Sequence, residues 1–422
     1  MSGPPVVDRV EVAVVGGGPG GLAAAAMLKR RGMHPVVFER DALGSFWRGQ
    51  YDRLHLHTIR WLSNLPGYHF PRSEGKWVSR DGVVRHLERY AAHYSLDVRV
   101  GVEVQRVDRT EGGWRLETSK GPIDAWAVVL ATGYNLQPVK PDWPGVETFE
   151  GDLVLGSDYR RPQPYAGRNV LVVGTGNSGA EISVDLVEGG AAKVWLSYRT
   201  PPNVTVRDGP IPPPLLGMVL RALHVSTRNG DRLMAFLTRK LVSELATYGL
   251  PPAPRGVVTQ MVRDDVIPVI DVGLIGMLRK GLVQPVPAVK SVAGSQVNLV
   301  DGTRLLPDVV IACVGYRRGL EPLVGHLGLL APNGKPLAFG GKEVGSAPRM
   351  FFVGYKNTIA GMFREFGYEA KHIARVLRKR PRDMQFPSPL RGPRAVAETE
   401  QSPSGPSSVA NTVAKLEVTP MA

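Results

Sequence analysis

Two glycine-rich motifs are the residues of this 422-residue chain whose types and spacing most clearly predict chemistry. Both follow the pattern G-x-G-x-x-G, in which the first glycine permits a tight turn, the second lets the backbone approach a phosphate, and the third lets a helix pack on a strand. The motif residues are Gly16, Gly18, Pro19, Gly20 and Gly21 in the first motif, and Gly174, Gly176, Asn177, Ser178 and Gly179 in the second. Because each motif is expected to open a helix, whose N-terminus attracts anions, the sequence predicts two sites for the pyrophosphate of a dinucleotide.

The strand after each motif ends in residues that distinguish the two sites. Glu39, followed by Arg40, ends the strand after the first motif, where a carboxylate accepts hydrogen bonds from ribose hydroxyls. The corresponding strand after the second motif ends at Ser197 and Arg199 without an acid, and a guanidinium group can bind a 2′-phosphate. The first site is therefore expected to hold FAD and the second NADPH rather than NADH, unless Arg199 is an ordinary solvated residue.

The elements that must position these motifs follow from the apolar pattern of the chain. Residues 10–15 and 35–39 are predicted to be strands around a helix at 22–29, and the same order of elements returns at 169–198. A strand–glycine–helix–strand unit that occurs twice is typical of nucleotide-binding α/β proteins. The sequence therefore predicts two Rossmann-like dinucleotide-binding domains, with the NADP domain inserted into the FAD domain.

Two further apolar strands, at 127–133 and 309–315, end at similar glycine turns and are expected to return the chain to the edge of a dinucleotide domain. Thr132 and Gly133, in the first of these turns, are candidate FAD contacts. The end of the chain is rich in Pro, Ser, Ala and Thr and has no apolar periodicity, which predicts disorder. The predicted divisions are 8–164 and 306–380 for the FAD-binding domain, 165–305 for the NADPH-binding domain, and 381–422 for a disordered tail.

The formal net charge of +14 raises the question of a nucleic-acid partner. The basic residues are scattered and no basic run is interleaved with aromatic residues, so no nucleic acid is expected; a diffuse positive field also suits a dinucleotide. No apolar run is long enough to span a membrane, and the first residues do not have the layout of a signal peptide. A cytoplasmic location is expected, and the oligomeric state stays open.

A single cysteine, Cys313, limits where electrons from the two nucleotides can go. Together FAD and NADPH imply hydride transfer from the nicotinamide to the flavin. Disulfide reductases of this architecture need a pair of redox-active cysteines, and iron–sulfur clusters need several cysteine ligands, so both classes are excluded. Dioxygen, a quinone or another diffusible acceptor remains.

Residues 149–160 resemble the signature F-x-G-x-x-x-H-x-x-x-[YF]-[KR] of the flavin-containing monooxygenase family. The matching residues are Phe149, Gly151, Tyr159 and Arg160. Leu155 stands where the family has histidine, so the role of that histidine is absent here or is supplied elsewhere. As in that family, the block lies between the two glycine motifs.

The sequence is most similar to the YUCCA-like branch of this family, from about Val10 to Arg380. The segments that recur there in the same order are 51–57, 65–66, 76–79, 248–250, 268–273 and 301–302. Two segments depart from the plant pattern, the one after Arg199 and the one at 361–367. These departures leave the substrate open.

The resemblance implies a monooxygenase that uses FAD, NADPH and O2 through a C4a-hydroperoxyflavin to oxygenate a small molecule. If it extends to the substrate, the reaction is oxidative decarboxylation of an aromatic 2-oxo acid such as indole-3-pyruvate; otherwise an amine, a sulfide or a ketone is equally open. Two alternatives keep both glycine motifs. One is an NADPH-dependent flavin reductase or dehydrogenase that passes electrons to a quinone or other acceptor, and the other is a non-catalytic binder of redox nucleotides.

The same resemblance suggests which side chains surround the flavin ring. These candidates are Trp47, Arg53, His55, Leu56 and His57. Each histidine could equally be a surface residue or a hydrogen-bonded core residue, and no metal is expected because no carboxylate or cysteine completes a ligand set with them. Met362, Phe363 and Phe366 either line a substrate pocket or pack in the core.

Overall fold

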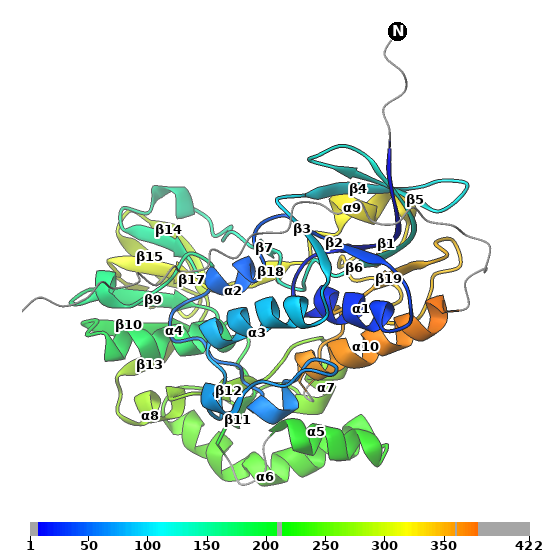
Figure 1. The fold of residues 1–422 in the computed structure, drawn as a ribbon. Helices are drawn as coiled ribbons and strands as arrows, with labels where there is room; N and C mark the ends of the chain where they lie inside the picture. Colours follow the sequence, from blue (N-terminus) through cyan, green and yellow to red (C-terminus); the bar gives the residue numbers. More distant parts are fainter. Residues whose placement is uncertain (1–6, 209–212, 359–360, 379–422) are drawn as a thin grey trace, which may run out of the picture. The chain divides into compact units, whose positions relative to one another are not determined.

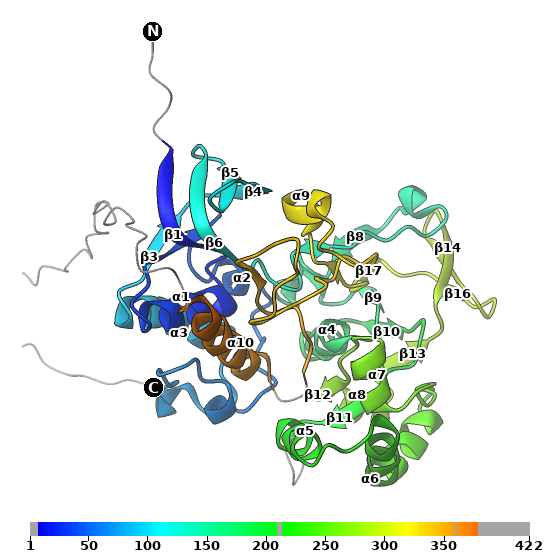
Figure 2. The same cartoon turned by 90° about the vertical axis from the view of Figure 1, so that its right-hand side faces the viewer.

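The computed structural model describes residues 7–208, 213–358 and 361–378. Two separate sheets with mainly parallel strands dominate them (Figures 1 and 2), and each is built around one of the glycine motifs. The strands of the first sheet, in the order β3-β2-β1-β6-β5-β4 with β19 added on β6, are β3 (Asp97–Val100), β2 (Pro35–Glu39), β1 (Asp8–Val15), β6 (Ile123–Leu130), β5 (Trp114–Thr118), β4 (Val104–Arg109) and β19 (Met350–Phe352).

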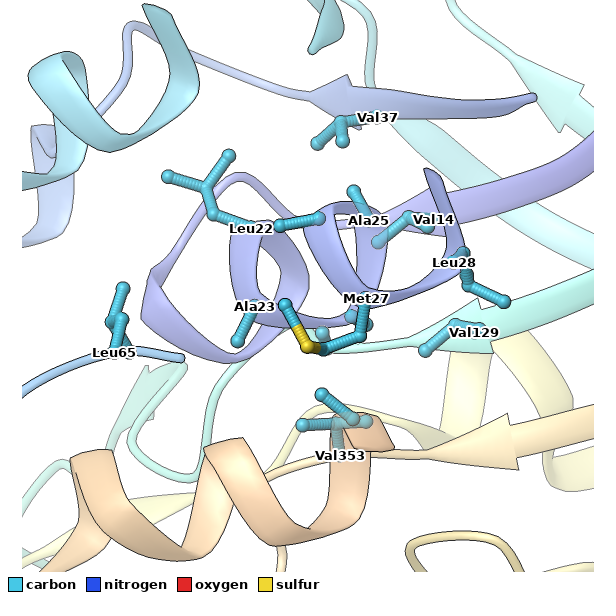
Figure 3. Close-up of a cluster of buried hydrophobic side chains, with 14 of the residues drawn as sticks. Val14, Leu22, Ala23, Ala25, Met27, Leu28, Val37, Leu65, Val129 and Val353 are labelled. Carbon is cyan, nitrogen blue, oxygen red and sulfur yellow. The ribbon is translucent and has the colours of Figure 1, made fainter. Parts of the chain in front are cut away.

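The centre of the first sheet is parallel and buried. Val14 of β1 lies opposite Val37 of β2 and Val129 of β6, and six consecutive residues of β1 are buried. Runs of β-branched residues suit this position because a parallel sheet is covered on both faces. The alanine-rich helix α1 (Pro19–Lys29) packs on one face, and Figure 3 shows Leu22, Ala25 and Met27 among the valines of the strands.

The second sheet follows the order β13-β10-β9-β17-β8 and is parallel throughout. Its strands are β13 (Val283–Val286), β10 (Lys193–Ser197), β9 (Asn169–Val173), β17 (Val309–Ala312) and β8 (Asp152–Leu155). Val172 of β9 lies between Leu196 of β10 and Ile311 of β17. Helix α4 (Asn177–Glu188) packs on this sheet as α1 packs on the first. We call the first sheet with the elements packed on it the first unit, and the second sheet with its elements the second unit.

The chain leaves the first sheet after β6 and returns to it at β19, and it builds the second sheet in between. The antiparallel pair β7 (Gln137–Pro138) and β18 (Tyr316–Arg317) joins the outgoing and returning connections. This topology confirms the predicted α/β fold of two Rossmann-like domains with one inserted into the other.

The predicted division points do not follow the strands of the second sheet. The predicted ranges of the first domain, 8–164 and 306–380, include β8 and β17 respectively. Both strands pair within the second sheet. A short β-branched strand that ends in a glycine turn has the same pattern in either sheet, so the sequence could not assign it. The predicted tail, 381–422, lies outside the described residues.

The remaining elements surround these two sheets. The helices are α2 (Ser45–Arg48), α3 (Arg80–His93), α5 (Pro213–Ala222), α6 (Thr227–Thr247), α7 (Val257–Arg263), α8 (Leu274–Arg279), α9 (Glu321–Val324) and α10 (Met362–Leu377). The strands are β11 (Val204–Val206), β12 (Val269–Asp271), β14 (Val289–Ala293), β15 (Gln296–Leu299) and β16 (Arg304–Leu305). Among the described residues, no helix combines the length and the apolar character needed to cross a membrane.

Candidate dinucleotide-binding sites

The first glycine motif forms a tight turn between β1 and α1. Gly16 has φ +107°, and a Cβ on it would lie 2.5 Å from the carbonyl oxygen of Ala131. A Cβ on Gly21 would lie 1.9 Å from the carbonyl oxygen of Gly16, so α1 can approach β1 only with glycine here. A Cβ on Gly18, in contrast, would meet no protein atom within 4 Å. The fold itself requires Gly16 and Gly21, whereas Gly18 borders open space.

The second motif repeats this geometry closely. Gly174 has φ +113°, and its Cβ would lie 2.3 Å from the carbonyl oxygen of Cys313. A Cβ on Gly179 would lie 1.9 Å from the carbonyl oxygen of Gly174, and one on Gly176 would meet no protein atom within 4 Å. We call these two turns the first cradle (residues 16–21) and the second cradle (residues 174–179).

Each cradle ends in a helix N-terminus without a side-chain cap. Gly18 and Gly176 are the N-cap residues of α1 and α4, and no side chain accepts a hydrogen bond from the first turn of either helix. Such uncapped N–H groups, beside a glycine with no neighbouring protein atom, suit a phosphate group. The Asn177 side chain is engaged elsewhere, because its Oδ1 accepts a hydrogen bond from the Ile270 backbone N–H at 2.7 Å. Both cradles therefore fit the pyrophosphate of a dinucleotide.

Glu39 lies at the first cradle. Its Oε2 accepts a hydrogen bond from the backbone N–H of Gly17 at 2.6 Å, and its Oε1 accepts one from Asp41 at 3.0 Å. This contact holds the carboxylate, at the end of β2, against the glycine turn. Arg40 is exposed and contacts Asp41 at 3.2 Å.

Arg199 follows β10 at the corresponding place of the second cradle. It is exposed, and within the described ranges it has no hydrogen-bond or ion-pair partner. Ser197 is buried instead, and its hydroxyl donates to the carbonyl oxygen of Pro287 at 2.8 Å. Of these two predicted contacts, Arg199 has its charged group available for a ligand, whereas the hydroxyl of Ser197 is already used.

The turns after β6 and β17 border the two cradles in the same way. Thr132 bonds to the hydroxyl of the fully buried Tyr355 at 2.8 Å, and Gly133 (φ +96°) has open space beside it. Gly315 (φ +97°) is the equivalent in the second unit, also with open space. Gly315 was not among the predicted contacts, although it ends the same strand-and-glycine pattern as Gly133 and could be found from that pattern. Burial raises the pKa of the nearby Cys313 thiol to about 12.

The candidate flavin neighbours have different surroundings. Leu56 is buried in the core of the first unit, and the Trp47 ring packs against this core. The centroids of the Trp47 and Phe363 rings are 6.1 Å apart. His55 contacts the carbonyl oxygen of Arg53 at 2.7 Å, which is the local hydrogen-bonded alternative. His57 instead reaches α4, where its Nε2 lies 2.5 Å from Oε1 of Glu181.

Phe363 and Phe366 take part in packing. Phe363 is buried in the same core as Leu56, and Phe366 packs on the first cradle, where a Cβ on Gly20 would lie 3.6 Å from its ring. Met362 is half-buried at the start of α10. Within the described ranges, no cluster of His, Cys, Asp and Glu side chains has the arrangement of a metal site.

The 149–160 block holds the second unit in place. Tyr159 is fully buried, stacks on Tyr165, and donates to Oδ2 of Asp185 in α4 at 2.7 Å. The backbone carbonyl of Arg160 accepts a hydrogen bond from Asp52, and Leu155 ends β8 opposite Ala312. The matched positions therefore support α4 and the second sheet.

Comparison with known proteins identifies the family. A sequence profile described as pyridine nucleotide-disulphide oxidoreductase matches residues 13–208. The indole-3-pyruvate monooxygenase YUCCA1 of Oryza sativa subsp. japonica is 34% identical over 336 residues, which are 75% of this chain and 80% of that protein. The probable indole-3-pyruvate monooxygenase YUCCA3 of Arabidopsis thaliana is 32% identical over 345 residues, with 76% and 77% covered.

A solved structure supports the same conclusion. The flavin-containing monooxygenase from Stenotrophomonas maltophilia superposes on this chain with a TM-score of 0.65 at 25% sequence identity. The superposition covers 87% of this chain and 99% of that structure. Members of this family use FAD and NADPH, in agreement with the two cradles. The chain belongs to the flavin-containing monooxygenase family, on the branch of the YUCCA enzymes.

Proposed function

We propose that the first cradle binds FAD, that the second binds NADPH, and that the enzyme oxidatively decarboxylates an aromatic 2-oxo acid such as indole-3-pyruvate. The cofactor assignment depends on one observation: the two cradles have nearly equal glycine geometry but a different charged residue beside each. Glu39 lies at the first, and Arg199, which has no partner among the residues that the structure describes, follows the strand beside the second. The names of the plant relatives support the substrate class.

The bound flavin supplies the redox chemistry, because it accepts a hydride from NADPH and reacts with dioxygen. The protein residues bind and orient the two nucleotides. The uncapped N-termini of α1 and α4 would hold the phosphates, and Glu39 would accept hydrogen bonds from ribose hydroxyls. Trp47 and Phe363 contribute apolar surface beside the first core. Burial raises the pKa of the Cys313 thiol to about 12, which disfavours the thiolate that a nucleophilic role requires.

The reaction balances without a further reactant. One 2-oxo acid, one O2, one NADPH and one proton give the carboxylic acid shortened by one carbon, CO2, NADP⁺ and water. One oxygen atom enters the new carboxyl group and the other leaves as water.

Mass spectrometry of products formed under ¹⁸O2 tests this proposal. Purified enzyme with NADPH and indole-3-pyruvate should give indole-3-acetate that carries one ¹⁸O, with one NADPH consumed per CO2 released. A sulfide and an amine serve as comparison substrates, and incubation without NADPH serves as the control. Oxygenation of the sulfide or amine instead would overturn the substrate class.

The same assay separates the reductase alternative. A flavin reductase would oxidise NADPH at an undiminished rate with a quinone under argon. Under ¹⁸O2, with catalase present to remove hydrogen peroxide, it would form no ¹⁸O-labelled indole-3-acetate. That result would overturn the oxygenation proposal while leaving both cofactor assignments in place.

A further inference from the structure

Helix α4, which begins at the second cradle, carries acidic residues along one side. They are Glu181, Asp185 and Glu188, spaced four and three residues apart, so they share one face of the helix. Two side chains of residues 51–57 engage this face, because His57 contacts Glu181 and Arg53 contacts both Asp185 (3.4 Å) and Glu188 (2.9 Å). The segment after α2 thus runs beside α4 (Figure 1).

Glu181 is the most buried member of this face. Its side chain is 3% exposed, and Nε2 of His57 lies 2.5 Å from its carboxylate. Tyr51 is buried, and its hydroxyl interacts electrostatically with the nearby Glu181 carboxylate and with Ser178, the second residue of α4. Burial and the neighbouring carboxylate hold the pKa of Tyr51 well above 10, so Tyr51 stays a neutral donor. A buried carboxylate needs such partners, because a buried charge left without one is strongly destabilising.

The same short segment also belongs to both hydrophobic cores. Tyr51 is buried in the core of the second unit and Leu54 packs against that core, whereas Leu56 is buried in the core of the first unit. The Leu56 backbone N–H donates to Val78 at 2.8 Å, which anchors the end of the segment in the first unit. The contact between His57 and Glu181, with the buried Tyr51 beside Glu181, therefore lies next to the first core.

We propose that Tyr51, Glu181 and His57 are positioning residues that couple the two cradles, so that NADP⁺ bound at the second cradle strengthens FAD binding at the first, and the reverse. This inference rests on the cofactor assignment proposed above. The physical reason is that a phosphate bound at the N-terminus of α4 would stabilise this helix, and Glu181, at the start of its second turn, contacts His57 of segment 51–57. Coupling between two binding sites is reciprocal by thermodynamic necessity.

Nucleotide affinities measured with and without the second nucleotide test the coupling. The FAD dissociation constant of the flavin-free protein is measured by flavin fluorescence, alone and with saturating NADP⁺, and the NADP⁺ constant is measured by calorimetry with and without FAD. For the unmodified protein we expect each nucleotide to tighten the other about 5- to 150-fold. In Glu181→Gln and in His57→Gln this factor should fall towards one, while the NADP⁺ affinity measured alone changes less than about threefold.

Tyr159→Phe is the matched control. It removes a buried hydrogen bond to Asp185, one turn further along α4, and it leaves the contact between His57 and Glu181 intact. Coupling should persist in this variant even if its Tm falls. His57→Gln changes a side chain that is 25% exposed, so it provides a second test should Glu181→Gln fail to fold.

The outcomes separate the two proposals. Equal loss of coupling in Tyr159→Phe and Glu181→Gln, or no coupling in the unmodified protein when both nucleotides bind, would overturn the coupling proposal and leave the cofactor assignment standing. Failure of the unmodified protein to bind FAD would overturn the assignment and the coupling with it. Loss of coupling confined to Glu181→Gln and His57→Gln supports both.

Discussion

The two cradles have nearly the same glycine geometry, but different parts of the chain surround them. At the first, α1 is apolar on all sides and α10 covers it, with Phe366 and Val353 beside Gly20. Figure 2 shows α1 and α10 side by side. At the second, α4 carries a row of acids that face segment 51–57. The first nucleotide site is thus enclosed by apolar packing, whereas the second borders a polar contact between units.

This difference has an energetic consequence. Apolar side chains that interdigitate closely resist local rearrangement, because they are packed as densely as in a crystal. Contacts between domains are more polar and permit relative motion more readily. The first cradle therefore suits a cofactor that stays bound, and the second suits a nucleotide that exchanges in each catalytic cycle.

Matched alanine substitutions at Gly18 and Gly176 are expected to give the largest effect. Both positions have ordinary φ values, −74° and −77°, and an added Cβ meets no protein atom, so the fold should be unaffected. The methyl group would instead occupy the place of the pyrophosphate and weaken binding about 100-fold. Gly18→Ala should lose FAD on gel filtration, while Gly176→Ala should retain FAD and lose affinity for NADPH.

The absorbance of the purified proteins and calorimetric titration with NADPH give the measurement, with the Tm of the flavin-free proteins as a check of folding. A fully flavin-loaded Gly18→Ala protein would contradict the assignment of the first cradle. A Gly176→Ala protein that loses FAD but not NADPH affinity would show that the two assignments are exchanged.

Arg199→Ala is expected to act next most strongly. Removal of charge-assisted hydrogen bonds to a 2′-phosphate should raise the KM for NADPH about 10- to 100-fold. The KM for NADH should stay nearly unchanged, because NADH lacks this phosphate. Lys193→Ala is the control, since Lys193 is an exposed cation at the opposite end of the same strand. Steady-state kinetics with both nucleotides measure the effect, and equal changes for NADPH and NADH would exclude Arg199 as the phosphate ligand.

The smallest effect concerns stability at the first cradle. Burial raises the pKa of Glu369, on α10, to about 7, while its Oε2 accepts a hydrogen bond from Gly354 at 2.8 Å. Because the folded state holds this proton more tightly than the unfolded chain, stability is full below about pH 4.5 and falls as pH rises through about 7. The loss is on the order of 1–3 kcal/mol, a few degrees in Tm.

Glu369→Gln keeps the acceptor for Gly354 and cannot ionise. Melting curves between pH 5 and 8 should therefore show a smaller decline of Tm for this variant than for the unmodified protein. Parallel declines for the two proteins would mean that other groups carry the pH dependence.

The fold and both cradles could be predicted because their signals are local. A glycine that must adopt positive φ or admit a close carbonyl, such as Gly16 or Gly21, has no substitute, so the motif records the geometry directly. Glu39 follows in the same way from its place at the end of a strand. The assignment of β8 and β17 failed, because a strand does not record which neighbour it pairs with.

The sequence by itself determined two dinucleotide domains, their order, and the absence of a cysteine pair, because glycine spacing, strand patterns and residue counts are properties of the chain. The tertiary structure decided how the domains meet. His57 and Glu181 are 124 residues apart, and nothing local to either predicts that they touch. Segment 51–57, predicted to lie near the flavin, contacts α4, the helix that begins at the second cradle. Such contacts between distant segments depend on how whole elements pack.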